Sequence, residues 1–333
     1  MSKVTREEAL APILPFLGPI EDLLLDESVT EIMVNSAEEL YCERKGVLTR
    51  CPAPGWTERA LERAIVQIAR SLDSDIGVAA PLLDARLPDG SRVAAALPTI
   101  SEAPVLTIRK HPAKAFTVSQ LVESGTLPPE VLETARHVLA ARGNILVAGS
   151  TSSGKTTLLS ALLNDLEPGE RYLVIEDTAE IQLEQPHTVR LTARKAAPGR
   201  PAVTIRDLVK AALRHRPDRL VVGEVRGGEA WDLIQALNTG HGGAISTIHA
   251  NTADDALMRL ATCALMQEGS GSVPWAALAS IIGAVTDLVI HVARWQGVRM
   301  VGGVLRVLRY DPGRQTWETE AAWPRPVGKE GMG

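Results

Sequence analysis

One eight-residue stretch, residues 149–156, constrains the fold of this chain more than any other feature. It reads GSTSSGKT and matches the pattern G-x-x-x-x-G-K-[ST]. A short apolar run, residues 144–148, precedes it and is typical of a buried parallel strand, and residues 157–163 have the composition of a helix. Strand, glycine loop and helix are the context that this pattern requires. The sequence therefore predicts a loop that binds the phosphates of a nucleoside triphosphate.

The residue types in the loop fit this chemistry. Gly149 and Gly154 let the backbone form a concave nest of N–H groups, with the positive end of a helix behind it. Lys155 is expected to reach the β- and γ-phosphates, and the Thr156 hydroxyl to ligate Mg²⁺. A nucleoside triphosphate and Mg²⁺ are thus the predicted ligands of the loop. The predicted nucleotide-binding residues are Gly149, Ser150, Thr151, Ser152, Ser153, Gly154, Lys155, Thr156 and Thr157.

The composition is that of an ordinary globular chain. Its 333 residues are 45% hydrophobic and 23% charged, which suggests two domains. The net charge of -5 disfavours a chain-wide footprint for nucleic acid, though not a local basic patch. Three cysteines without a Cys-x-x-Cys pair predict ordinary thiols in a reducing compartment, and neither a zinc site nor a disulfide framework. With no signal peptide and no apolar stretch of about 18 residues, we expect a cytoplasmic protein, at most peripheral to a membrane.

The pattern of predicted strands and helices changes once along the chain. Residues 1–110 contain short strands and one amphipathic helix, residues 57–72, and predict a small α+β domain. Residues 111–116 have the character of a linker. From residue 117 to residue 312, helices alternate with apolar strands, which is typical of a parallel α/β sheet. Residues 313–333 are interpreted as a polar tail.

Polar side chains follow three of the predicted parallel strands. Glu176 closes the strand at residues 172–175, Glu224 follows the strand at residues 220–222, and His249 ends a third. The ligand of an open α/β sheet lies at the carboxyl ends of the strands. A glutamate there can hold Mg²⁺ or orient a water molecule on the γ-phosphate. A solvated surface group is the alternative for each glutamate, and a hydrogen-bonded structural residue is the alternative for the histidine.

Four motifs follow one another in the chain: GSTSSGKT, IEDTAE, LVVGEVR and GHGGAISTIHAN. In this order they resemble the secretion ATPase superfamily of type II and type IV secretion systems. The residues around the last two are most similar to the conjugation branch typified by TrbB, and the CpaF-like pilus branch is close behind. The resemblance covers roughly residues 20–308. It implies a RecA-like P-loop ATPase domain preceded by a smaller N-terminal domain, a hexameric ring, and partners among inner-membrane components of a secretion or conjugation machine.

The resemblance also implies roles for single residues. Glu176 falls on the glutamate of the acidic motif, Glu224 on the Walker B glutamate, and His249 on the histidine of the last motif. Thr156 and Glu224 would organise Mg²⁺ while Glu176 polarises the attacking water, although the two glutamates could exchange roles. The resemblance implies that the nucleotide is ATP, so ATP and Mg²⁺ are the predicted cofactors. The predicted reaction is hydrolysis of ATP by in-line attack of water.

Members of this superfamily also direct arginines of the N-terminal domain onto the phosphates. The stretches DGSRV and LTIRK nominate Arg92 and Arg109, with Arg86 as a competitor. A tetracysteine zinc element found in some type II members is missing, which argues against that branch.

A basic stretch between the second motif and the next helix leaves two interpretations open. It is either a solvated or subunit-facing loop, or a contact for DNA or an acidic partner. Its basic residues are Arg190, Arg194, Lys195 and Arg200. The predicted function is a cytoplasmic ATPase that powers conjugative transfer or type IV secretion. A CpaF-like pilus-assembly ATPase, a DNA-stimulated RecA-type translocase and a small-molecule kinase are the alternatives, and direct nucleic-acid binding is left open.

Overall fold

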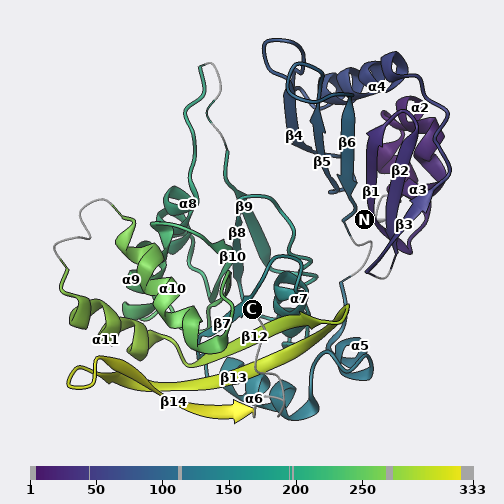
Figure 1. Cartoon of the computed structure of the whole chain (residues 1–333). Helices are drawn as coiled ribbons and strands as arrows, with labels where there is room; N and C mark the ends of the chain where they lie inside the picture. The colour runs from purple at the N-terminus through teal and green to yellow at the C-terminus, as the bar shows by residue number, and fades with distance from the viewer. Residues whose placement is uncertain are drawn as a thin grey trace. The chain divides into compact units, whose positions relative to one another are not determined.

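The computed structural model describes residues 5–44, 46–111, 115–194, 196, 199–267 and 273–323. The chain forms two compact units, Met1–Lys114 and Ala115–Gly333. The division falls inside the stretch predicted as a linker, of which residues 112–114 lie outside the described residues. In each unit, helices pack on a sheet (Figure 1).

The N-terminal unit is built on a six-stranded antiparallel sheet. The strand order is β3-β2-β1-β6-β5-β4, so β3 and β4 are the edge strands. The strands are β1 (Val29–Ser36), β2 (Glu39–Arg44), β3 (Val47–Cys51), β4 (Leu82–Arg86), β5 (Arg92–Ala96) and β6 (Val105–Arg109). The smaller α+β architecture predicted for this part of the chain is confirmed.

Helices contribute the rest of the N-terminal core. The helix α4 (Glu58–Ser71) begins after Thr57, whose side chain accepts a hydrogen bond from the N–H of Ala60. Its apolar stripe packs with alternate residues of the strands, which confirms the helix predicted at residues 57–72. Short helices before β1 enter the same core: α1 (Arg6–Leu10), α2 (Leu14–Leu17), η1 (Gly18–Ile20) and α3 (Glu21–Leu25).

The C-terminal unit is built on an eight-stranded sheet of order β14-β13-β12-β7-β11-β10-β8-β9 (Figure 1). The strands from β12 to β9 in this order run parallel, and β13 and β14 add to them antiparallel. Their bounds are β7 (Ile145–Gly149), β8 (Tyr172–Glu176), β9 (Thr188–Thr192), β10 (Arg219–Val225), β11 (Ile245–Ile248), β12 (Leu288–Trp295), β13 (Val298–Asp311) and β14 (Thr316–Trp323). The predicted parallel-sheet α/β class is confirmed.

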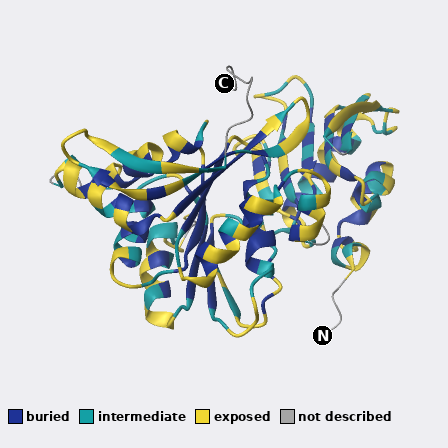
Figure 2. Ribbon diagram, turned by 90° about the horizontal axis from the view of Figure 1, so that it is seen from below, coloured by how far each residue is buried: buried dark blue, intermediate teal, exposed yellow. Residues whose placement is uncertain are grey.

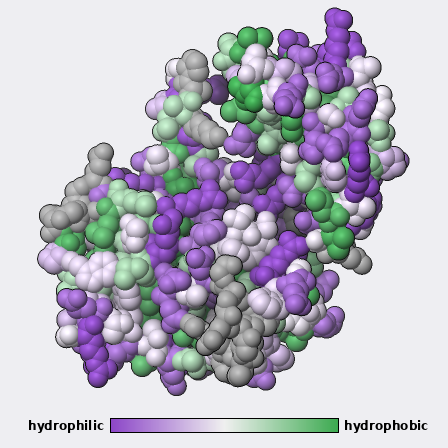
Figure 3. Space-filling model, in the orientation of Figure 1, coloured by the Kyte–Doolittle hydropathy of each residue, from purple (hydrophilic) through white to green (hydrophobic). Residues whose placement is uncertain are grey.

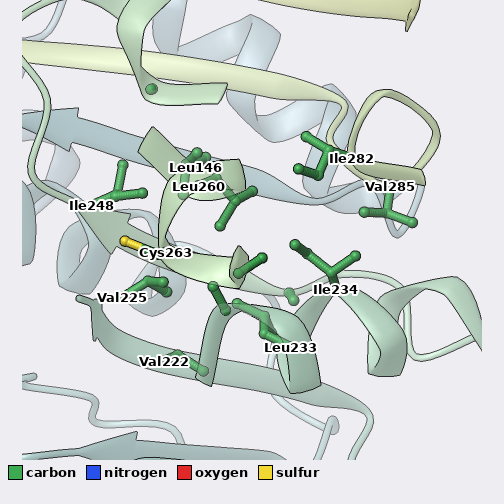
Figure 4. Packing of buried hydrophobic residues seen from close by; sticks show 14 of the residues in the cluster. Leu146, Val222, Val225, Leu233, Ile234, Ile248, Leu260, Cys263, Ile282 and Val285 are labelled. Carbon is green, nitrogen blue, oxygen red and sulfur yellow. The ribbon is translucent and has the colours of Figure 1, made fainter. Parts of the chain in front are cut away.

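Alternate residues of the central strands face two separate cores. In β7, Leu146 and Ala148 pack with α8 to α11, whereas Ile145 and Val147 pack with α5 to α7. The helices are α5 (Val118–Glu123), α6 (Pro129–Ala140), α7 (Lys155–Asn164), α8 (Ile205–Ala212), η2 (Leu213–His215), α9 (Glu229–Asn238), α10 (Ala253–Leu265) and α11 (Trp275–Val285). Figure 2 shows the buried strands between helices whose outer faces are exposed, and Figure 4 shows part of the first core. Burial on both faces explains why the central strands are apolar throughout.

The prediction of a polar tail after residue 312 is wrong for residues 316–323, which form β14 against β13. Trp317 anchors this strand. Its ring packs edge-on against Trp275 and Tyr310, and its Nε1 donates to the carbonyl of Ala279 at 3.0 Å. A two-stranded addition at a sheet edge keeps one polar face, so its sequence resembles a loop. Residues 324–333 lie outside the described residues.

The surface mixes polar and apolar residues. Large exposed hydrophobic side chains occur in both units, for example Val47 and Leu48 on β3 and Met258 on α10. Figure 3 shows hydrophobic residues interspersed with hydrophilic ones on the face in view. None of the helices in the described ranges combines the length and the apolar content needed to cross a bilayer.

Candidate active site

The residues predicted from four motifs meet at one edge of the C-terminal sheet. The strands β7, β11, β10 and β8 are consecutive neighbours and all run parallel. The glycine loop follows β7, His249 follows β11, Glu224 lies near the end of β10, and Glu176 ends β8. Because parallel strands end at the same edge, the structure brings these four elements together.

The glycine loop, residues 149–154, joins β7 to α7. At two of its positions the backbone adopts a conformation that requires glycine. Gly149 has φ +156°, and a Cβ there would lie 2.3 Å from the carbonyl oxygen of Val292 and 2.5 Å from Ser153 Oγ. Gly154 adopts φ +105° directly before the helix starts at Lys155. The loop therefore packs tightly against β12 and against its own Ser153, with the N-terminus of α7 at its end.

The polar groups of this loop form a donor set suited to phosphate. Lys155 is largely buried, and its ammonium donates to the carbonyls of Gly149 and Ser150, each at 2.9 Å. Ser153 is also buried, and its hydroxyl has no hydrogen-bond partner among the described residues. An ammonium, a buried hydroxyl and the N–H groups at a helix N-terminus together fit a polyphosphate anion.

A magnesium ion would rely on the phosphates as well as on the protein. In the described part of the chain, no group of three or more histidine, cysteine, aspartate or glutamate residues could hold a metal ion. Magnesium is commonly held by one or two protein oxygens together with substrate phosphates. Thr156, in the first turn of α7, and Glu224 on β10 supply oxygens of the right kind. The residues present therefore fit a magnesium–nucleotide complex.

Glu176 is a buried carboxylate with only 3% of its surface exposed. Its Oε1 accepts hydrogen bonds from the N–H groups of Glu180 (2.7 Å) and Ile181 (2.8 Å). A Cβ on Gly223 of the neighbouring β10 would lie 2.9 Å from the Cγ of Glu176. Glycine at this point of β10 therefore leaves room for the glutamate. The two backbone hydrogen bonds hold Oε1 in place, and this also fixes the direction in which Oε2 points.

The surroundings of Glu176 change its acidity. Burial raises the pKa of this carboxyl above its ordinary value, while the two backbone N–H groups and the Arg190 guanidinium act in the opposite direction. A raised pKa brings a carboxylate closer to the basicity that favours proton acceptance at neutral pH.

Arg190 corrects one prediction of the sequence analysis. It was expected in a loop, but it lies in β9 and its guanidinium donates to the carbonyls of Ile181 (2.8 Å) and Leu183 (2.9 Å). Its Nη1 is 3.9 Å from Glu176 Oε2. Arg190 thus braces the segment that follows Glu176. Lys195, from the same predicted stretch, lies outside the described residues.

Glu224 has a different environment. It is half-buried, and its Oε2 accepts a hydrogen bond from Arg226 Nε at 2.9 Å and forms an ion pair with the same guanidinium. Its hydrogen bond to the Glu224 carboxylate raises the pKa of Arg226. The Arg226 side chain is 63% exposed, so the pair can open towards a bound ion at little cost.

The two halves of the histidine motif lie at opposite ends of β11. His249 follows the strand and is exposed at the edge that carries the glycine loop. His241 precedes the strand, and its Nδ1 lies 3.2 Å from the carbonyl oxygen of Ala236. Gly243, also before the strand, accepts a hydrogen bond from the buried Arg219. The glycine half of the motif is therefore structural, and only the His249 half reaches the candidate site.

The three N-terminal arginine candidates stand in one row across the N-terminal sheet. Arg86 is paired with Arg92, and Arg92 with Arg109, in the strand register, and Glu31 continues the row beside Arg109. Residues next to them on each strand are buried in the core, so the row lies on the other face. Like charges opposite one another destabilise a sheet. The row is therefore a candidate surface for an anion, and the register does not select one arginine over the others.

Sequence reasoning missed Arg299, which lies on β13 beside the glycine loop. Its Nε donates to the carbonyl of Ser152 at 3.3 Å, and its Cδ is 3.3 Å from the place of a Cβ on Gly154. This contact depends on β12, which pairs with both β7 and β13. No local pattern marks such a pairing.

A glycine loop between a strand and a helix, on a parallel sheet with acidic residues at the same edge, defines a P-loop nucleotide-binding domain of the RecA-like kind. The family described as "Type II/IV secretion system protein" matches residues 16–296, and the chain belongs to this family.

Relatives match nearly the whole chain. The chain is 34% identical to a protein named "Probable conjugal transfer protein TrbB" from Sinorhizobium fredii, over 89% of this chain and 88% of that protein. It is 36% identical to "Type IV secretion system protein PtlH" from Bordetella pertussis, over 84% of this chain and 90% of that protein. The structure of the Legionella pneumophila ATPase DotB matches with a TM-score of 0.61 at 22% identity, covering 89% of this chain and 81% of that one, and supports the fold.

Proposed function

We propose that this protein is a motor ATPase that hydrolyses ATP to drive conjugative transfer or type IV secretion. One observation carries the proposal: in a member of this family, the glycine loop, Glu176, Glu224 and His249 lie at one edge of one sheet. The names of the two relatives, a conjugal transfer protein and a type IV secretion protein, support the process.

Each group has a proposed role in the attack of water on the γ-phosphate. Lys155 and the N–H groups of the glycine loop bind and neutralise the phosphate oxygens. Glu176 orients the water and accepts its proton, and His249 contacts the γ-phosphate. Thr156 and Glu224 hold Mg²⁺, which supplies charge neutralisation at the phosphate oxygens when it is bound. Arg299, beside Ser152, adds positive charge at the loop.

The proposed partners follow from the family. The protein works as a homo-hexameric ring in the cytoplasm, peripheral to the inner membrane, and engages inner-membrane components of a secretion or conjugation machine. The direct test measures phosphate release from ATP with and without added DNA, together with transfer by a host that lacks the gene. We expect ATP hydrolysis that depends on magnesium and whose rate changes by less than about twofold when DNA is added. We also expect that only active protein restores conjugative transfer or secretion in the host that lacks the gene. Severalfold stimulation by DNA with a steep salt dependence would favour a nucleic-acid translocase instead.

The rate of ATP hydrolysis is expected to fall at acid pH because the Glu176 carboxylate becomes protonated. Its raised pKa means that the carboxylate takes up a proton at a pH above the ordinary 4.5, and a protonated carboxyl cannot accept the proton of water. The acidic midpoint of kcat should therefore lie above 4.5. The measurement is kcat against pH at saturating ATP and Mg²⁺, with circular dichroism at each pH to monitor folding. A midpoint at or below 4.5 in folded protein contradicts this role.

Replacing Arg109 with alanine is expected to lower kcat at least tenfold, because the arginine row is proposed to neutralise charge on the transferring phosphoryl group. An arginine with this role is worth about 10³–10⁵ in rate in GTPases. The matched control is Arg70→Ala on α4, an exposed arginine outside the row. Steady-state ATPase assays compare both variants, and mixing Lys155→Ala with Arg109→Ala subunits tests for partial rescue. Equal activity of the two arginine variants would count against the proposal.

A further inference from the structure

Two cysteines of the N-terminal unit lie in contact although they are nine positions apart in the sequence. Cys42 is on β2 and Cys51 is on β3, and their Sγ atoms are 2.9 Å apart. The strand register places Cys51 opposite Leu40 and Cys42 opposite Thr49. Both thiols therefore point to the core side of this hairpin, as diagonal neighbours, and both are free cysteines. The hairpin is formed by the two adjacent strands labelled β2 and β3 in Figure 1.

The two thiols differ in access. Cys42 has no exposed surface, whereas Cys51 is partly exposed on the edge strand of the sheet. A reagent from solvent therefore meets Cys51 first. Burial raises the pKa of Cys42 to about 11, so this thiol stays protonated at neutral pH.

The guanidinium group of Arg44 contacts the buried sulfur of Cys42. Arg44 Nη1 lies 2.7 Å from Cys42 Sγ, and its Nε pairs with Asp26 at 3.3 Å. A cation at this position stabilises a thiolate as it forms. The same cation opposes binding of a metal ion by the two sulfurs, and no third ligand joins them among the described residues. The cluster is thus suited to sulfur exchange and unsuited to a metal.

We propose that Cys42 and Cys51 are a redox-active pair that forms a reversible disulfide by exchange with low-molecular-weight disulfides. The Cys51 thiol gives up its proton to solvent, and the thiolate attacks one sulfur of the external disulfide, forms a mixed disulfide and releases one thiolate, which takes up a proton. Cys42 then gives up its proton to solvent, and its sulfur attacks Cys51 Sγ and expels the second thiolate, which takes up a proton. Two protein thiols are oxidised and one external disulfide is reduced to two thiols.

The geometry favours this second step over a lasting adduct. A disulfide needs its sulfurs about 2 Å apart, so the two atoms must approach by less than 1 Å. The third cysteine, Cys263, is buried in the C-terminal unit and packs in its core. It therefore serves as an internal reference that the reaction leaves unchanged.

The test uses the full-length reduced protein and oxidised glutathione. Wild type, with three cysteines, should fall from three reagent-accessible thiols to one after denaturation, and its mass should fall by two hydrogen atoms without retained glutathione. Dithiothreitol should reverse both changes. Cys263→Ser should lose both of its thiols in the same way, because Cys42 and Cys51 remain.

Variants of the pair separate the two steps. Cys51→Ser should stay unmodified, because its remaining N-terminal thiol is buried. Cys42→Ser should keep a glutathione adduct on Cys51, and Arg44→Gln should prolong the adduct severalfold. Three thiols remaining in wild type, a stable adduct in wild type, or a disulfide between two chains would overturn the proposal. If a serine variant fails to fold, the thiol count and mass of wild type and Cys263→Ser still decide.

Discussion

Lys155→Ala is expected to abolish ATP hydrolysis while the protein keeps its fold. The Lys155 ammonium donates hydrogen bonds to the carbonyls of Gly149 and Ser150, and neither bond joins one element of the core to another. The substitution removes a largely buried positive charge from a loop that is suited to bind phosphate. In the proposed mechanism this charge stabilises the β- and γ-phosphates throughout the reaction. We expect less than about a tenth of wild-type turnover.

The matched control for this change is Lys210→Ala in α8. Lys210 pairs with Asp232 at 3.4 Å and has 52% of its side chain exposed. Asp232 keeps its ion pair with Arg206 at 2.7 Å, so we expect the loss of Lys210 to cost less than about 1 kcal/mol. Phosphate release, far-UV circular dichroism and thermal melting are measured on both variants. Folded Lys155→Ala protein that retains more than about a tenth of the activity contradicts the assignment, as does equal loss in the control.

The glycine loop and its flanking elements could be predicted because their signals are local. Residues 144–163 contain an apolar run, two glycines at fixed positions and a helical segment, and each of these depends on neighbours in sequence. The helix α4 is similar, since Thr57 caps it and its apolar residues recur with helical spacing. Such features need no knowledge of the rest of the fold.

The rest depended on pairing between distant segments. The strand β14 resembles a polar loop until β13 is beside it. Arg190 was assigned to a loop because β9 is an edge strand in which no residue is fully buried, so its sequence lacks the apolar run of the central strands. The contact between Cys42 and Cys51 follows from hairpin register, which cysteine spacing does not reveal. The room that Gly223 leaves for Glu176 likewise requires two adjacent strands. Register is a tertiary property, so these parts of the site appear only in the structure.

Replacing Glu176 or Glu224 with glutamine is expected to impair ATP hydrolysis in two different ways. Glu176→Gln should bind ATP with nearly unchanged affinity but lower kcat by about 10²–10⁴, the usual contribution of a general base. The amide oxygen can still accept the hydrogen bonds from Glu180 and Ile181, so the buried segment stays in place. Only the charge and the proton-accepting oxygen are lost.

Glu224→Gln should instead raise the Mg²⁺ concentration that gives half-maximal activity. Glu224 shares its Oε2 with the Arg226 guanidinium, and an amide there holds both the arginine and a hydrated cation less strongly. Turnover at saturating Mg²⁺ should return towards that of wild type. Nucleotide binding and kcat are each measured over a range of Mg²⁺ concentrations for both variants, with Glu130→Gln on the exposed surface of α6 as the control.

The comparison decides between two assignments of the same pair. A buried carboxylate with raised pKa and two backbone donors suits proton acceptance, whereas a half-buried carboxylate in an exposed ion pair suits exchange with a cation. If Glu224→Gln loses turnover at every Mg²⁺ concentration while Glu176→Gln shifts the Mg²⁺ dependence, the roles are reversed. If both variants behave like Glu130→Gln, the acidic edge of the sheet is not the site of hydrolysis, and the proposed mechanism is wrong.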